Sequence, residues 1–97
     1  MTLQEFQNTS QIDNDWTILL QSLWYDKHGN WDKAHDLADS LLDQDAAWVH
    51  AYLHRKEGDK WNANYWYSRA GRSMPNMTLA EEWEYLAEYF IKKEQSF

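Results

Sequence analysis

The sequence has no cysteine among its 97 residues, which sets several classes of protein aside at once. Without cysteine the chain can form neither a disulfide framework nor a thiolate metal site. A chain that needs no disulfides suits a reducing compartment, so we expect a cytoplasmic protein.

Basic residues are also scarce. Nine lysines and arginines stand against sixteen aspartates and glutamates, which gives a net charge of −7. A field of that sign repels phosphate backbones. The composition therefore predicts that nucleic acid is not a partner.

Long apolar runs are missing as well. The uninterrupted apolar stretches reach only a few residues, whereas a membrane-spanning helix needs about 20. The start of the chain, "MTLQEFQNTSQIDND", lacks the basic and apolar regions of a signal peptide. We expect no membrane partner.

Aromatic residues, in contrast, are abundant: there are seven Trp, six Tyr and three Phe. Each can bury on the order of 150–250 Å² in a core, so a few helices can close one domain of this length. We expect a single helical domain over residues 13–97, preceded by an irregular N-terminal segment, residues 1–12.

The spacing of apolar residues predicts an all-α fold, because it follows the helical period and no segment alternates with period two. About five helices are expected. They cover residues 13–28, 31–42, 46–57, 59–70 and 78–94.

Two short motifs predict how these helices are connected. The stretches "GNWDKA" (29–34) and "GDKWNA" (58–63) share the form Gly-[Asn/Asp]-x-x-x-Ala. Glycine can end one helix in a left-handed conformation, and Asn or Asp can cap the next one. We therefore expect two antiparallel hairpins, residues 13–43 and 46–70, with residues 78–94 packed as a C-terminal capping helix.

The stretch "GDKWNANYWYSRAG" resembles the second helix of tetratricopeptide and Sel1-like repeats, which have a Gly-Asp-type turn followed by Ala-x-x-Trp-Tyr-x-[Lys/Arg]-Ala. The matching residues are Ala63, Trp66, Tyr67, Arg69 and Ala70, with Pro75 at the closing proline. The resemblance implies helical hairpins in a right-handed stack and a role in protein interaction. Residues 47–72 are also similar to a segment of small bacterial proteins, which implies a bacterial source.

The stretch "WVHAYLHRKEGD" (48–59) carries the most distinctive chemistry. On a helix, His50, His54 and Glu57 share one stripe, and in an alternative interpretation these three residues are the ligands of a metal ion. Histidines four residues apart form half of a zinc, nickel or copper site, and His28 or His35 could supply a further ligand. A hydrolytic or acid–base role for His54 and Glu57 is part of the same alternative.

A structural role for these histidines is the favoured interpretation. Apolar residues surround the helix on nearly every side, so it should be buried, and its histidines then need hydrogen-bond partners from neighbouring helices. The metalloprotease motif is absent because Ala51 follows His50, and no serine lies in a nucleophile-elbow context. We therefore expect no cofactor and no enzyme.

The favoured function is that of a non-enzymatic module that binds a protein or peptide. Its site is expected in the groove between the first helices of the two hairpins and along one stripe of helix 59–70. The predicted binding residues are His50, His54, Arg55, Asn62, Tyr65 and Arg69. In the alternative interpretation of the stripe, it packs on the last helix and Arg69 pairs with a glutamate there. Self-association through Tyr85 and Tyr89 is compatible with this function.

Overall fold

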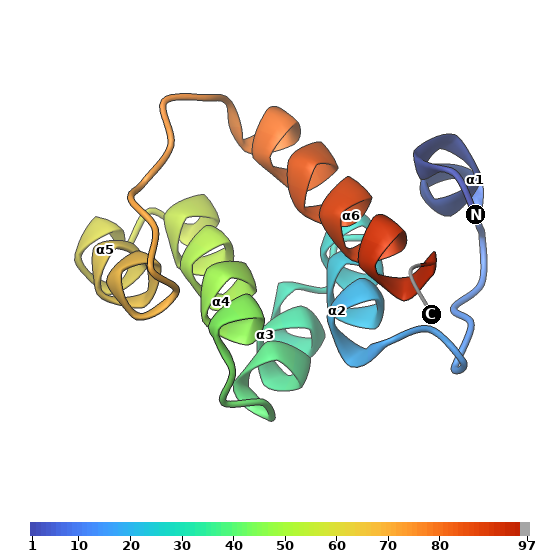
Figure 1. The fold of residues 1–97 in the computed structure, drawn as a ribbon, viewed down its shortest axis with the longest axis horizontal. Helices are drawn as coiled ribbons and strands as arrows, with labels where there is room; N and C mark the ends of the chain where they lie inside the picture. The colour runs from blue at the N-terminus through green and yellow to red at the C-terminus, as the bar shows by residue number, and fades with distance from the viewer. Residues whose placement is uncertain (96–97) are drawn as a thin grey trace.

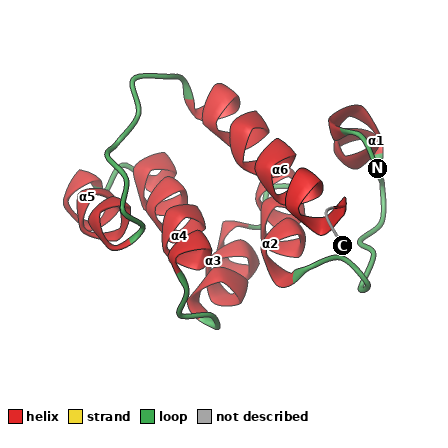
Figure 2. Cartoon of the chain, viewed as in Figure 1, coloured by secondary structure: helices red, strands yellow, loops and turns green. Residues whose placement is uncertain are grey.

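Six helices make up the regular structure of residues 1–95, the part of the chain that this computed structural model describes, and no strand occurs there (Figure 2). The helices are α1 (Leu3–Asn8), α2 (Ile18–Lys27), α3 (Trp31–Asp39), α4 (Gln44–Glu57), α5 (Lys60–Arg69) and α6 (Leu79–Gln95). The predicted all-α fold is confirmed, with one helix more than expected. None of the helices in this part is long and apolar enough to cross a bilayer.

Helices α2 and α3 form one hairpin, and α4 and α5 form a second, as the repeated motif predicted (Figure 1). Gly29 and Gly58 occupy the left-handed region, with φ of 81° and 90°. The side chain of Asn30 then accepts a hydrogen bond from the backbone N–H of Lys33, and that of Asp59 accepts one from Asn62. Each turn thus ends one helix and caps the next. Helix α3 packs on α4 and joins the two hairpins.

Helix α6 does not extend the row of hairpin helices, as a cap on its end would. It packs against α2 and α4, the first helices of the two hairpins, and also contacts α1 (Figure 1). The Trp83 indole donates to the carbonyl of Leu23 on α2, and Arg55 on α4 pairs with Glu82. The chain's own last helix therefore fills the groove in which we expected a partner.

The N-terminal segment differs from the sequence-based expectation. Residues 1–12 were expected to be irregular, but α1 forms there behind a capping box in which Thr2 and Glu5 satisfy each other's backbone N–H groups. The helix carries one deeply buried side chain, Phe6, which lies between Trp16 and Trp83. A single apolar anchor leaves no periodic pattern to detect.

Two helix boundaries also moved. Helix α2 begins at Ile18 rather than near Asp13, because Asp13 accepts a hydrogen bond from the backbone N–H of Asp15 and forms a turn. Helix α3 ends at Asp39, and Leu42 beyond it is 95% exposed. The predicted extension to residue 42 was wrong because Leu42 has no core to enter.

Candidate functional site: a buried histidine cluster

Three histidines from two helices converge beneath the hairpin interface. His35 comes from α3, while His50 and His54 lie one turn apart on α4 with stacked rings, 5.0 Å between centroids. One ring nitrogen from each histidine lies within 4.8 Å of the others. The Nε2 atoms of His35 and His50 are 2.8 Å apart and share a hydrogen bond. Each of the three imidazoles thus offers one nitrogen as a ligand to a common metal ion.

Two tryptophans form the walls of the cluster. The Trp66 indole of α5 stacks on His50 with 3.9 Å between ring centroids and 15° between planes. Trp31 stacks on His35 in the same way at 5.0 Å and is held in place because its indole N–H donates to the carbonyl of Leu53. The walls restrict the ring orientations of His35 and His50 and exclude water from one side of each.

The electrostatic environment keeps His50 neutral. Its burial, followed by the neighbouring His35 and His54 rings, lowers its pKa to about 4, against a small opposing effect of Asp39. A neutral imidazole has one nitrogen with a free lone pair, which is the form that binds a metal ion.

Glu57 fixes the orientation of His54. Its carboxylate oxygen lies 2.6 Å from Nδ1 of His54, which donates to it. In a neutral His54 the proton is then on Nδ1, and Nε2 carries the lone pair. Asp59 lies close to the same pair, but its oxygens accept hydrogen bonds from the backbone and side chain of Asn62. Of the two carboxylates, Glu57 is therefore the one that accepts a hydrogen bond from His54.

The donor set suits a small divalent ion. Three imidazole nitrogens around tetrahedral zinc lie about 3.4 Å apart, given Zn–N distances of about 2.0–2.1 Å. The separations in the cluster bracket this value, with 2.8 Å between His35 and His50 and an upper limit of 4.8 Å.

The structure resolves two questions that the sequence left open. His50 and His54 are buried, 4% and 9% exposed, as the structural interpretation predicted. The partner of His50 is His35 on the neighbouring α3, but that of His54 is Glu57 on the same helix and not on a neighbouring one. Of the two candidates for a third ligand, His35 joins the cluster. His28 lies apart from it on the surface, stacked on Trp24.

The other predicted binding residues lie in different places. Arg55 is half-buried and is bound by Glu82 and by the carbonyl of Met77, and Asn62 is bonded to Asp59. Tyr65 and Arg69 are exposed on α5. The predicted set is therefore not one site: it divides between the buried interior and the outer face of α5.

Sequence reasoning did not identify the tryptophan walls. Trp66 was noted as a residue that matches the repeat motif, and Trp31 was not singled out. Stacking between an indole and an imidazole on another helix leaves no local signal, so only the packing of α3, α4 and α5 could reveal it.

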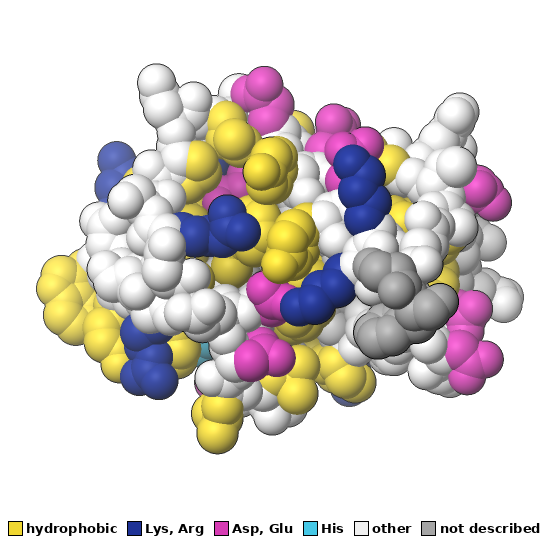
Figure 3. Space-filling model, viewed as in Figure 1, with side chains coloured by type: hydrophobic (Ala, Val, Ile, Leu, Met, Phe, Trp, Pro, Cys, Tyr) yellow, Lys and Arg dark blue, Asp and Glu magenta, His cyan; other side chains and the backbone are white. Residues whose placement is uncertain are grey.

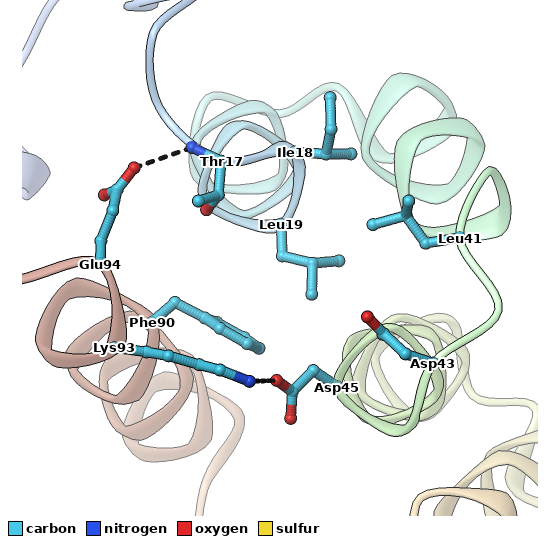
Figure 4. Close-up of a pocket in the computed structure, with 9 residues that line it drawn as sticks. All are labelled: Thr17, Ile18, Leu19, Leu41, Asp43, Asp45, Phe90, Lys93 and Glu94. Carbon is cyan, nitrogen blue, oxygen red and sulfur yellow. Dashed lines mark hydrogen bonds and ion pairs between the residues drawn. The ribbon is translucent and has the colours of Figure 1, made fainter. Parts of the chain in front are cut away.

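A separate hollow of about 220 Å³ lies between α2, α6 and the start of α4 (Figure 4). Leu19, Leu41 and Phe90 form its apolar lining. The charged groups at its rim are already engaged: Lys93 pairs with Asp45, and Glu94 accepts from the backbone N–H of Thr17. The hollow brings no reactive groups together.

No protein-family model, no curated protein and no solved structure matches this chain. The resemblance to tetratricopeptide and Sel1-like repeats stays a prediction.

Proposed function

We propose that this protein binds a divalent first-row transition metal through His35, His50 and His54, with zinc as the best match. One observation carries the proposal: a ring nitrogen from each of three histidines, on two packed helices, lies within 4.8 Å of the others. The sequence favoured an interaction module and ranked a metal site second. The addition of His35 to the two histidines of α4 reverses that order for this cluster.

The protonation states support metal binding. His50 has a pKa of about 4 and is neutral near pH 7, so no proton has to be removed from it before a metal binds. His54 donates through Nδ1 to Glu57, which leaves Nε2 as its metal-binding atom. A carboxylate behind a metal-bound histidine raises the basicity of that ligand and fixes its tautomer. In this proposal Glu57 orients a ligand and does not bind the ion itself.

The ligand type selects the metal. Imidazole suits zinc, copper, iron and nickel, whereas magnesium and calcium prefer oxygen ligands. Three protein ligands leave one tetrahedral position for water or another small ligand. The walls beside His35 and His50 are indole faces, which offer no polar group to hold a substrate. We therefore propose binding and assign no reaction to the site.

Titration of tag-free protein with zinc tests the proposal. We expect one ion per chain by calorimetry and, with cobalt in place of zinc, the visible absorption of a tetrahedral ion. Free zinc at about 100 times Kd should stabilise the fold by roughly 2.7 kcal/mol, which corresponds to a rise of roughly 10–20 °C in Tm.

His35→Ala should abolish the binding, and His28→Ala is the matched control because that histidine lies outside the cluster. Circular dichroism without metal checks that both variants fold. If zinc does not bind, or if His28→Ala weakens binding as much as His35→Ala, the cluster is a structural hydrogen-bond network.

A further inference from the structure

Helix α5 lies at the edge of the fold and has one uncovered face. Among residues 1–95, α5 packs on α4 and on no other helix, because α6 crosses α2 and α4 instead (Figure 1). Ala63 and Tyr67, on the covered side, are fully buried. On the outer side Trp61 is 75% exposed and Tyr65 is 44% exposed.

The uncovered face is an ordered surface of two aromatic rings and a guanidinium. Trp61 and Tyr65 lie one turn apart with nearly parallel rings, 8° between planes. Arg69, a further turn along, donates to the Tyr65 hydroxyl at 3.0 Å and lies over the Trp66 ring. Trp, Tyr and Arg are the side chains that contribute most at protein interfaces. We call Trp61, Tyr65 and Arg69 the α5 face.

Charge around this face is opposite to that of the molecule. Helix α5 itself carries Lys60 and Arg69 and none of the sixteen acidic residues, although the chain has a net charge of −7. Arg72, beyond the end of the helix, lies over the Trp48 ring of α4 and is not part of this face. No carboxylate in the described part of the chain pairs with Arg69. The alternative in which Arg69 pairs with a glutamate of the last helix is therefore excluded. In Figure 3 hydrophobic side chains lie beside Lys and Arg at the left end, where Figure 1 has α5.

We infer that the α5 face docks an acidic amphipathic helix of a partner protein. Such a helix would place apolar side chains on Trp61 and Tyr65 and a carboxylate on Arg69. The three residues lie at i, i+4 and i+8 and span about 12 Å along α5, which matches two turns of a helix packed alongside it. The guanidinium, already oriented over aromatic rings, has further N–H donors for a carboxylate.

Nucleic acid is a weaker match for this face. The two basic residues of α5 neutralise few phosphates, and the acidic excess of the rest of the chain repels a polyanion over a longer range. A short acidic helix, in contrast, can place its carboxylates beside the basic residues of α5 without extending over the acidic surface. This inference does not depend on the metal site, because the α5 face lies on the outside of α5 and the histidine cluster on the inside.

Fluorescence anisotropy with two labelled synthetic peptides tests the inference. One is a helical peptide of about 15 residues with leucines on one face and glutamates flanking them, and the second replaces each glutamate with lysine. We expect the acidic peptide to bind and the lysine peptide to bind about tenfold more weakly or not at all. Trp61→Ala and Arg69→Gln should each weaken the acidic peptide by about tenfold or more.

Tyr85→Ala is the matched control, since Tyr85 is an exposed aromatic residue on α6, 55% exposed, away from this face. It should leave binding unchanged. Three results would each overturn the inference: equal binding of both peptides, an equal loss in Tyr85→Ala, or tighter binding of a single-stranded oligonucleotide at physiological salt. A wild-type dimer that Trp61→Ala converts to a monomer would also overturn it, because a second copy would then occupy the face.

Discussion

At the scale of single residues, the notable contact is the hydrogen bond between His35 and His50. Two imidazoles can share a proton in this way only when at least one of them is neutral, and the surroundings of His50 favour its neutral form. Every buried side-chain nitrogen and oxygen in the described residues has a hydrogen-bond partner. A metal ion would therefore be held by three converging nitrogens and would not satisfy an otherwise unpaired buried group.

Glu57→Gln separates the orienting role from metal ligation. An amide oxygen still accepts from Nδ1 of His54 but carries no charge, so the variant should bind zinc about 10–100-fold more weakly at unchanged 1:1 stoichiometry. Calorimetry measures this, and nitrogen chemical shifts of His54 report its tautomer. Glu84→Gln, on the exposed side of α6, is the control. Unchanged affinity in Glu57→Gln would show that the carboxylate does not act through His54, while zinc binding by the wild type would still stand.

Two buried tyrosines predict a loss of stability at alkaline pH. The hydroxyl of Tyr52 donates to Asp26 and that of Tyr67 donates to Glu82, and burial together with these carboxylates raises both pKa values. The unfolded chain ionises near pH 10, when the folded chain does not. Stability is therefore full below about pH 10 and falls above it by up to about 1.4 kcal/mol per pH unit for each tyrosine.

The variant Tyr52→Phe tests this through the difference from wild type. At pH 8 it should be less stable by roughly 1.5–3 kcal/mol, because a hydrogen bond to the Asp26 carboxylate, which also pairs with Lys56, is lost. Above pH 10 the difference in free energy of unfolding between the variant and the wild type should narrow. Two buried tyrosines ionise on unfolding of the wild type, whereas only Tyr67 does so in the variant. Urea unfolding at several pH values measures the gap, and a constant gap would contradict the prediction.

At the scale of elements, the turn between α4 and α5 determines where the site forms. It carries Glu57 on one side and Asp59, the cap of α5, on the other, and it directs Trp66 back onto His50. Gly58 makes this reversal possible with φ of 90°. A small change in this turn would move α5 relative to α4 and with it one wall of the histidine cluster.

Gly58→Ala should lower the free energy of unfolding by about 1–2 kcal/mol, because an L-residue is strained in the left-handed region. A methyl group there meets no atom within 4 Å, so the loss would come from the backbone and not from a clash. Gly58→Asn should lose less, since asparagine tolerates this conformation better. Urea unfolding measures both, and equal losses in the two variants would point to a different cause.

The elements that the sequence predicted are those with local signals. Helix α4 is apolar on nearly every side, both α4 and α5 are followed by a glycine, and both hairpin turns follow from the repeated motif. Helix α1 was missed because Phe6 is its one buried anchor. The position of α6 could not be predicted, because its apolar face would suit either α5 or the groove between α2 and α4.

The candidate site was predictable only in part, for a related reason. Spacing on one helix placed His50, His54 and Glu57 on a common stripe, and Glu57 does contact His54. Sequence alone could not choose between His28 and His35, which lie seven residues apart on either side of a turn. That choice depends on how α3 packs against α4, which is a contact between elements.

At the scale of the whole molecule, charge and packing are distributed unevenly. Helix α4 is central, with contacts to α2, α3, α5 and α6, whereas α5 is bounded by α4 alone among the described helices. Helix α5, at that open edge, carries Lys60 and Arg69 and no acidic residue. A molecule whose acidic surface repels other acidic proteins thus has one end at which an acidic segment can approach.

The two ends of the described chain are joined through the core, which predicts that α1 unfolds together with the rest. Phe6 is 1% exposed and stacks on Trp83 of α6 at 5.7 Å, with Trp16 packed edge-on at 5.0 Å. Phe6→Ala should therefore cost about 3–5 kcal/mol, a large part of the stability of a domain this size. Urea unfolding followed by circular dichroism measures the loss, with Leu42→Ala as the control because Leu42 is 95% exposed and should lose almost nothing. A loss below about 1 kcal/mol in Phe6→Ala would mean that α1 detaches without affecting α2 and α6, and that the fold is stable without its N-terminal helix.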